Sequence, residues 1–197
     1  MALTGLSRSI LALLAFVFLS LPAAAHAEIA KAVFAGGCFW CMEEAFDKVP
    51  GVVATTSGYA GGSVANPSYR QVVAGGTGHY EVVEVEYDTA KVSYDQLLDT
   101  YWKNVDPFDG GGQFCDRGQS YASAIFAPSA AASQAATVSK ATVEAKFGKP
   151  VATKILAAAP FYPAEDYHQN YYKTNALKYR SYKFGCGRPA RLSQLWD

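Results

Sequence analysis

The sequence predicts one α+β domain, in which helices cover a mixed sheet. Three observations lead to this fold class. Short apolar strands and amphipathic helices alternate irregularly instead of as repeated βαβ units. Neither an internal repeat nor a linker divides the 197 residues. Half of the residues are hydrophobic, which supplies enough apolar surface for one core.

The first 27 residues have the composition of a secretory leader. Arg8 provides a positive charge, the run from Ile10 to Leu21 is almost wholly apolar, and Ala25-His26-Ala27 is a small-x-small cleavage signal. The alternative is a retained membrane anchor, but the run is shorter than the roughly 20 residues that a spanning helix needs. We therefore expect a mature chain of residues 28–197, exported to the periplasm or secreted.

The charge and cysteine content argue against nucleic-acid binding, membrane binding and a structural zinc site. Without Arg8 the mature chain has 16 basic and 17 acidic residues, a balance that argues against nucleic acid or an anionic membrane as partner. In an exported protein, four cysteines allow two structural disulfides. A closed zinc site is disfavoured because only one CxxC pair and two histidines remain after the leader.

The first predicted elements place a cysteine between a strand and a helix. Lys31–Ala35 is a short apolar strand, Gly36-Gly37 permits a tight turn, and apolar residues then recur at helical spacing until Pro50-Gly51. We expect a helix through Val49 that begins at Cys38. The free N–H groups and dipole of a helix N-terminus favour a thiolate, so we expect the pKa of Cys38 to be lowered.

The middle of the chain predicts two strands and a short helix. Val52–Tyr59 is rich in β-branched residues, a glycine-rich loop follows, and Tyr69–Val73 is a short helix. Tyr80–Tyr87 alternates with period two and places Glu81 on its more apolar face with Val83 and Val85. A carboxyl there is a candidate buried acid, although such residues more often reach water at a strand end.

The second half predicts two further helices and two strands. Ser93 and Gln96 form a capping box, and Pro128-Ser129 opens an alanine-rich helix that ends near Phe147. The remaining segments are a glycine-rich loop (106–114), strands (122–126 and 155–158), a helical turn (165–172) and a polar C-terminal loop (183–197).

These elements converge on thiol chemistry with Cys38 as nucleophile. Candidate proton donors or positioning groups are Glu81, Asp116, Tyr69, Tyr121 and His168. Because Cys38-Phe39-Trp40-Cys41 is a CxxC motif at a helix start, one hypothesis is a thioredoxin-like thiol–disulfide oxidoreductase. That hypothesis assigns no role to the other glycine-rich and aromatic loops.

A second hypothesis comes from motifs spread over nearly all of the mature chain. They are Gly37-Cys38-Phe39-Trp40 with Glu43, Pro50-Gly51-Val52, Gly58-Tyr59 with Gly61-Gly62, Asn66-Pro67-Ser68-Tyr69, Thr77-Gly78-His79-Tyr80-Glu81, Asp116-Arg117-Gly118 with Tyr121, and the run from Phe161 to Gln169. In this order they closely resemble the A-type peptide methionine sulfoxide reductases, which act on the S epimer. The resemblance implies a two-layer α/β sandwich.

The resemblance also implies roles for the site residues. Cys38 attacks the sulfoxide sulfur, and Glu81 protonates the oxygen with help from the Tyr69 and Tyr121 hydroxyls. Asp116 positions the site. The rings of Phe39 and Trp40 hold the methyl group, and His168 contributes to substrate binding. The substrates are oxidised proteins or free methionine-S-sulfoxide.

The sequence offers two candidates for the cysteine that regenerates oxidised Cys38. Methionine leaves a sulfenic acid on Cys38. We expect Cys186, between glycines in a flexible C-terminal tail, to resolve it, with Cys41 as the alternative. Cys115 is interpreted as a small buried residue. No cofactor or metal is implied, a thioredoxin-like dithiol supplies the electrons, and the protein is expected to be a monomer.

Overall fold

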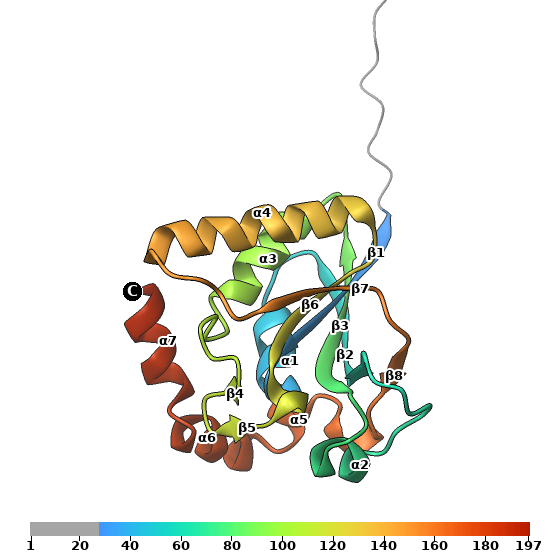
Figure 1. Cartoon of the computed structure of the whole chain (residues 1–197). Helices are drawn as coiled ribbons and strands as arrows, with labels where there is room; N and C mark the ends of the chain where they lie inside the picture. The colour runs from blue at the N-terminus through green and yellow to red at the C-terminus, as the bar shows by residue number, and fades with distance from the viewer. Residues whose placement is uncertain (1–27) are drawn as a thin grey trace, which may run out of the picture.

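The computed structural model describes residues 28–197, so the predicted leader lies outside the described residues. Its centre is a six-stranded sheet with the order β7-β6-β1-β3-β2-β8 (Figure 1). The strands are β1 (Ile29–Gly36), β2 (Val52–Ala60), β3 (Tyr80–Asp88), β6 (Ser123–Ala127), β7 (Lys154–Ala157) and β8 (Phe161–Pro163). Only β6 and β7 run parallel, and the other neighbours are antiparallel. The predicted mixed sheet is confirmed.

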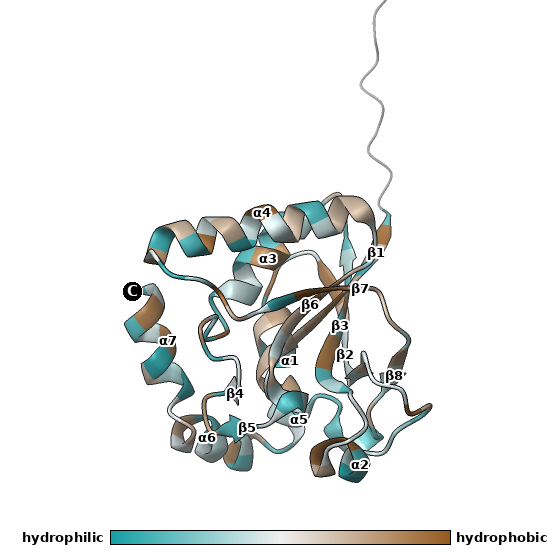
Figure 2. Ribbon diagram, in the orientation of Figure 1, coloured by the Kyte–Doolittle hydropathy of each residue, from teal (hydrophilic) through white to brown (hydrophobic). Residues whose placement is uncertain are grey.

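The two faces of the sheet differ in what covers them. Phe34, Val83 and Val85 point into the larger apolar cluster, whereas Ala35 and Val82 belong to a smaller one on the opposite face. The larger cluster also holds side chains of four helices: α1 (Phe39–Phe46), α2 (Tyr69–Ala74), α3 (Tyr94–Trp102) and α4 (Ala130–Phe147). Figure 2 shows hydrophobic residues along the central strands, whereas hydrophilic and hydrophobic segments alternate along α4.

The helix starts follow the predicted capping signals. The Ser93 hydroxyl accepts the backbone N–H of Gln96 at 3.2 Å, and the Gln96 side chain accepts the Ser93 N–H at 2.8 Å, which completes the capping box of α3. Ser129 caps α4 in the same way through the N–H of Ala132. The short helix α2 (Tyr69–Ala74) also lies where the sequence predicts it.

The C-terminal region is the main correction to the predicted fold. Residues 183–197 were expected to form a loop, but the chain forms α5 (Tyr171–Thr174), α6 (Ala176–Gly185) and α7 (Arg188–Trp196). The two glycines are helix-junction residues: Gly187 has φ +69° and forms the N-cap of α7. Tyr179 of α6 and Arg188 of α7 are buried, so these helices pack against the domain.

Smaller elements complete the fold. The sequence missed β8 and a hairpin of two short strands, β4 (Gly112–Gln113) and β5 (Asp116–Arg117), because such strands are too short to show a period. The 3-10 helices are η1 (Gln119–Tyr121) and η2 (Asp166–His168). Helix α1 ends at Phe46, before the predicted Val49. No helix within residues 28–197 is both long and apolar enough to cross a bilayer.

Candidate active site

Cys38 lies in the tight connection between the central strand and the first helix. It is the N-cap of α1, and its side chain is 4 % exposed. Gly37 before it has φ +78°, and a Cβ there would lie 2.5 Å from the Cβ of Gln113. The turn therefore requires glycine, and it fixes Cys38 at the end of the sheet.

Glu81 is a buried acid that lines the same cavity as the Cys38 thiol. It lies on β3, 2 % exposed, and its Oε2 accepts the backbone N–H of Phe39 at 3.1 Å. The pKa of Glu81 is raised to about 8. Burial is the main cause and the negative charges of Asp116 and Cys41 add to it, while the hydrogen bond from Phe39 acts in the opposite direction. The predicted buried acid is therefore present, and it is protonated at neutral pH.

A small cavity joins these two groups. Its volume is about 50 Å³, and its walls come from α1, α2, β3, the β4–β5 hairpin, η1 and α6. The lining residues are Cys38, Phe39, Trp40, Tyr69, Glu81, Asp116, Tyr121 and Tyr182. All but Tyr182 are residues that the sequence singles out. A larger cavity of about 650 Å³ lies between β1, α3 and α4, but its walls carry neither a thiol nor a buried acid, so the chemistry points to the smaller one.

Two tyrosine hydroxyls, those of Tyr69 and Tyr121, lie beside the carboxyl of Glu81. Tyr121 interacts through its hydroxyl with both Glu81 and Tyr69. Burial, followed by the negative charge of Glu81, raises the pKa of each tyrosine. Both hydroxyls therefore remain protonated and offer hydrogen-bond donors beside the carboxyl.

The two cysteines of the CxxC motif are free, buried and in contact with each other. Burial raises the pKa of Cys38 well above its usual value, and the neighbouring Cys41 and Glu81 raise it further. The hydrogen bond with Cys38 lowers the pKa of Cys41 to about 6, with further help from the charges of Arg188 and Lys183. The expectation of a lowered pKa at Cys38 is therefore wrong for the free protein, because desolvation outweighs the helix terminus and the thiolate of the pair is held by Cys41.

Aromatic rings form one side of the site. The Trp40 indole donates to His168 Nδ1 at 3.2 Å, and the His168 ring lies 4.9 Å from that of Phe39. Trp40 stacks on Tyr171 at 3.9 Å. Burial lowers the pKa of His168, so its ring is neutral, and Nε2 is buried without a protein partner. Sequence reasoning thus placed Phe39, Trp40 and His168 in one cluster.

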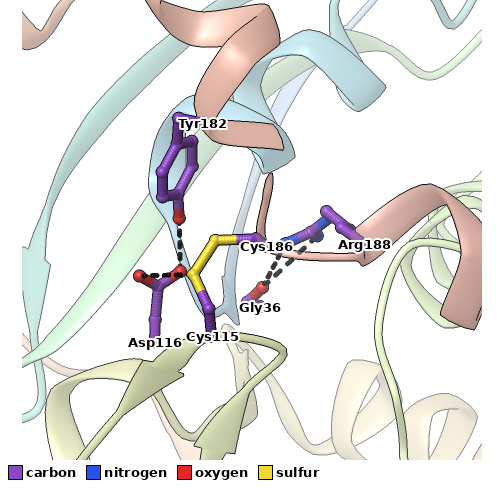
Figure 3. The surroundings of a disulfide bond; sticks show 6 residues. All are labelled: Gly36, Cys115, Asp116, Tyr182, Cys186 and Arg188. Atoms are coloured by element: carbon purple, nitrogen blue, oxygen red, sulfur yellow. Dashed lines mark hydrogen bonds between the residues drawn. A yellow bond between two sulfur atoms is a disulfide. The ribbon is translucent and has the colours of Figure 1, made fainter. Parts of the chain in front are cut away.

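Tyr182 is the residue that sequence reasoning missed. Its hydroxyl donates to Asp116 Oδ2 (Figure 3). The same hydroxyl interacts with Cys38, so it links the thiol to the carboxylate. Burial raises the pKa of Asp116, while the Tyr182 hydrogen bond and Arg188 lower it. The spacing of Tyr179 and Tyr182, which puts both rings on one helical face, was the available signal.

The other two cysteines are bonded to each other. Cys115 and Cys186 form a disulfide with a Cα–Cα distance of 4.8 Å across 71 residues of sequence. The interpretation of Cys115 as a buried residue is wrong: it is exposed, in the turn of the β4–β5 hairpin. The prediction that Cys186 lies in a flexible C-terminal tail is also wrong, because this residue lies between the packed helices α6 and α7.

One group within residues 28–197 has the spacing of metal ligands, namely Cys115, Asp116 and Cys186. The two sulfurs of this group are joined to each other, which removes the thiolates that a metal would need.

Comparison with known proteins gives a consistent result. The family model described as "Peptide methionine sulfoxide reductase" matches residues 30–197. The chain is 50 % identical over 179 residues to "Peptide methionine sulfoxide reductase MsrA 2" of Rhizobium meliloti, covering 91 % of this chain and 89 % of that protein.

Solved structures agree with the sequence comparison. Mxr1 from Saccharomyces cerevisiae in reduced form has a TM-score of 0.71 and 30 % identity, covering 75 % of this chain and 86 % of that one. The same yeast protein in complex with Trx2 has a TM-score of 0.53 at 23 % identity, covering 78 % and 91 %, and so supports the fold alone.

Proposed function

The chain belongs to the peptide methionine sulfoxide reductase family, and from this premise we propose how its site performs the reaction. The enzyme is a peptide-methionine (S)-S-oxide reductase. The observation that carries the proposed mechanism is the protonated carboxyl of Glu81 beside the thiol of Cys38 in a cavity walled by aromatic rings.

The proposed first step transfers the oxygen atom. A sulfoxide oxygen leaves sulfur only when it is protonated, and Glu81, with a pKa of about 8, holds the required proton at neutral pH. The Tyr69 and Tyr121 hydroxyls donate hydrogen bonds to the same oxygen. Phe39 and Trp40 accommodate the apolar methyl group, which orients the substrate sulfur toward Cys38.

The Cys38–Cys41 contact supports activation of the nucleophile. As Cys38 attacks the substrate sulfur, its proton passes to the Cys41 thiolate, which lies within hydrogen-bonding contact. The oxygen moves from the substrate sulfur to Cys38. The substrate sulfur gains two electrons and leaves as methionine, and Cys38 loses two electrons and becomes a sulfenic acid.

The geometry supports Cys41, the sequence alternative, for the next attack. Cys41 contacts Cys38 directly, whereas Cys186 is bonded to Cys115. Cys41 gives up the proton that it accepted from Cys38 and attacks the sulfenic sulfur, which forms the Cys38–Cys41 disulfide, and the hydroxyl group of the sulfenic acid leaves with that proton as water. Free and protein-bound methionine-S-sulfoxide are the proposed substrates, and a thioredoxin-like dithiol is the proposed electron source.

We also propose export through the segment 1–27. Support comes from the leader pattern in the sequence, with Arg8, the apolar run and Ala25-His26-Ala27. Mass spectrometry of the protein recovered from the periplasm should give an N-terminus at Glu28. An intact first residue on that protein would refute cleavage.

The function is tested by supplying the enzyme with dithiothreitol and each separated epimer of methionine sulfoxide. We expect methionine from the S epimer and none from the R epimer, at rates that exceed the reduction of insulin disulfides. Faster insulin reduction than sulfoxide reduction would favour the thiol–disulfide oxidoreductase hypothesis instead.

A further inference from the structure

The mechanism gives no role to Glu43, a buried acid that follows Trp40 by one turn of helix α1. Glu43 is 0 % exposed, although a glutamate is rarely buried completely without a partner of opposite charge. Its Oε1 accepts the backbone N–H of Asn170 at 2.9 Å, and within residues 28–197 its Oε2 is buried without a hydrogen-bond partner. Burying a carboxyl with so few hydrogen bonds lowers stability. The function of Glu43 is therefore sought in what its bond to Asn170 holds in place.

Asn170 lies between two residues that hold the Trp40 indole. His168 Nδ1 accepts the indole N–H at 3.2 Å, and the Tyr171 ring stacks on the indole with an interplanar angle of 13°. Asn170 has φ +52°, a left-handed conformation that asparagine adopts more readily than most residues, and it is the N-cap of α5, which packs against α1 (Figure 1). The bond from Glu43 thus fixes the point where the chain turns from one Trp40 contact to the other.

Other contacts hold this segment farther from the indole. The Gln169 side chain exchanges two hydrogen bonds of 2.9 Å with the backbone of β2. Tyr172 donates at 2.6 Å to Asp47, the C-cap of α1. Glu43 joins the segment to α1 three residues from Trp40, closer along the helix than Asp47. It is therefore the anchor that sets the indole relative to its two partners.

The bond to Asn170 does not require a charged carboxyl. The pKa of Glu43 is raised to about 7, mainly by burial and further by the charge of Asp47, while the Asn170 bond and Lys173 act in the opposite direction. The neutral carboxyl is therefore populated at neutral pH, and its carbonyl oxygen still accepts an N–H. An amide at position 43 keeps that acceptor, whereas a leucine of similar size removes it.

We propose that Glu43 is a positioning residue for the wall that receives the methyl group of the sulfoxide. Its hydrogen bond to Asn170 holds the segment 168–171, and this segment holds the Trp40 indole. The inference rests on the proposed function, which places the methyl group against that indole. Because the wall contacts the substrate alike before and during oxygen transfer, Glu43 acts on substrate affinity and not on the rate of the chemical step.

The first test measures methionine release in a single turnover at increasing concentrations of methionine-S-sulfoxide. Glu43→Leu should raise the half-saturating concentration about tenfold, the loss expected for a buried hydrogen bond, and keep the plateau rate. Glu43→Gln should match the wild type. The matched control is Glu44→Leu, at the next position, where the carboxylate pairs with Lys48 and Lys183 instead. An unchanged half-saturating concentration in Glu43→Leu, a fall in its plateau rate instead, or an equal loss in Glu43→Gln would overturn the proposal.

The second test approaches the same bond from Asn170. Asn170→Val should weaken substrate binding as Glu43→Leu does, because a β-branched residue disfavours the left-handed conformation, and Asn170→Gly should not. The double variant of Glu43→Leu with Asn170→Val should be no weaker than the weaker single variant, because both remove the same contact. Additive losses would overturn the proposal.

A third measurement observes the indole directly and needs no activity. The indole N–H resonance of Trp40 in an NMR spectrum, assigned with Trp40→Phe, should move in Glu43→Leu and stay in Glu43→Gln. The indoles of Trp102 and Trp196 donate to groups outside this segment and report whether the remaining domain is folded. If all three resonances of Glu43→Leu collapse, the Asn170 variants decide. An unmoved Trp40 resonance in a folded Glu43→Leu would overturn the proposal, whereas a wild-type enzyme that releases no methionine would contradict the proposed function instead.

Discussion

Two pairs of the same residue types lie around helix α1 in opposite charge states: Cys38 and Glu81 of β3 line the cavity, whereas Cys41 and Glu44 lie on the side that faces α6. On the cavity side, burial raises the pKa of Cys38 and holds that of Glu81 at about 8, so both are neutral. On the other side, Cys41 has a pKa of about 6 and Glu44 one of about 2.

The cations of the C-terminal helices explain the difference. Burial acts on both sides, but Lys183 forms an ion pair with Glu44 at 2.6 Å, and Lys48 forms a second at 2.7 Å. Arg188 and Lys183 also lower the pKa of Cys41. Within residues 28–197 no cation has this relation to Glu81, whose carboxyl accepts only the backbone N–H of Phe39 and interacts with Tyr121. The different charge states of the two pairs are thus set by the cations beside Cys41 and Glu44 rather than by residue type.

Substitution of the two cysteines should produce the largest difference between the two sides. Cys38→Ser should abolish methionine release, because an alcohol is a far weaker nucleophile than a thiolate. Cys41→Ser should release one methionine per enzyme and then stop, with a sulfenic acid left on Cys38. Quenched-flow counting of methionine together with a sulfenic-acid probe measures both. Continued turnover of Cys41→Ser with thioredoxin would return the first resolving step to Cys186.

The next largest difference should be that between the single-turnover rates of Glu81→Gln and Glu44→Gln. Glu81→Gln should lower the single-turnover rate about 10²–10⁴-fold, the usual range for a general acid. In the wild type the rate should fall as the pH rises through about 8, where Glu81 loses its proton, and the variant should lack this decrease. Glu44→Gln is the matched control and should keep it. If the rate of Glu81→Gln falls above pH 8 as that of the wild type does, Glu81 is not the general acid.

The tyrosines should have a smaller effect. Tyr69→Phe and Tyr121→Phe should each lower the single-turnover rate by about tenfold, since the remaining hydroxyl still donates to the oxygen and the carboxyl is intact. The double variant should lose more than either single one. If both single variants match the wild-type rate, the hydroxyls have no part in proton delivery.

Thermal stability should show the most direct contrast between the two glutamates. Between pH 4.5 and about 8 the folded chain keeps the Glu81 proton while the unfolded chain loses it, so stability falls as the pH rises. Glu81→Gln should therefore raise the free energy of unfolding at pH 9, by on the order of 3 kcal/mol. Glu44 has the opposite sign: its stabilisation is complete above its unfolded pKa and disappears as the pH falls through about 2.

Glu44→Gln should accordingly lower the free energy of unfolding at pH 9 by on the order of 1 kcal/mol, a value reduced for its partial exposure. Melting curves of both variants between pH 3 and 9 check the two signs. A shift of both in the same direction would contradict the contrast between the two sides of α1.

Most of the fold could be predicted because its signals are local. The capping box at Ser93, the glycine turn before Cys38 and the alternation of β3 each depend on neighbouring residues, and each was confirmed. The C-terminal helices were missed because Gly185 and Gly187 favoured a loop, and the buried side of α6 is supplied by distant residues such as Glu44, the partner of Tyr179.

The composition of the site was more predictable than its electrostatics. Seven of the eight cavity-lining residues lie in motifs that the sequence displays, whereas Tyr182 and the exposed Cys115 depend on the packing of α6 against the hairpin. The direction of the Cys38 pKa shift was wrong for the same reason. A helix start is visible in sequence, but burial and the approach of Arg188 are properties of the assembled chain.

Arg188 has a consequence for the order in which the enzyme matures. Its guanidinium donates to the backbone oxygen of Gly36, directly before the turn with Cys38, and lies 4.5 Å from the ring of Phe114. A nascent chain that ends before residue 188 already contains the thiols, the acid and all of the aromatic wall. It lacks one of the charges that favour the Cys41 thiolate, so the thiol pair gains its full reactivity only when the last helix has been synthesised and docked.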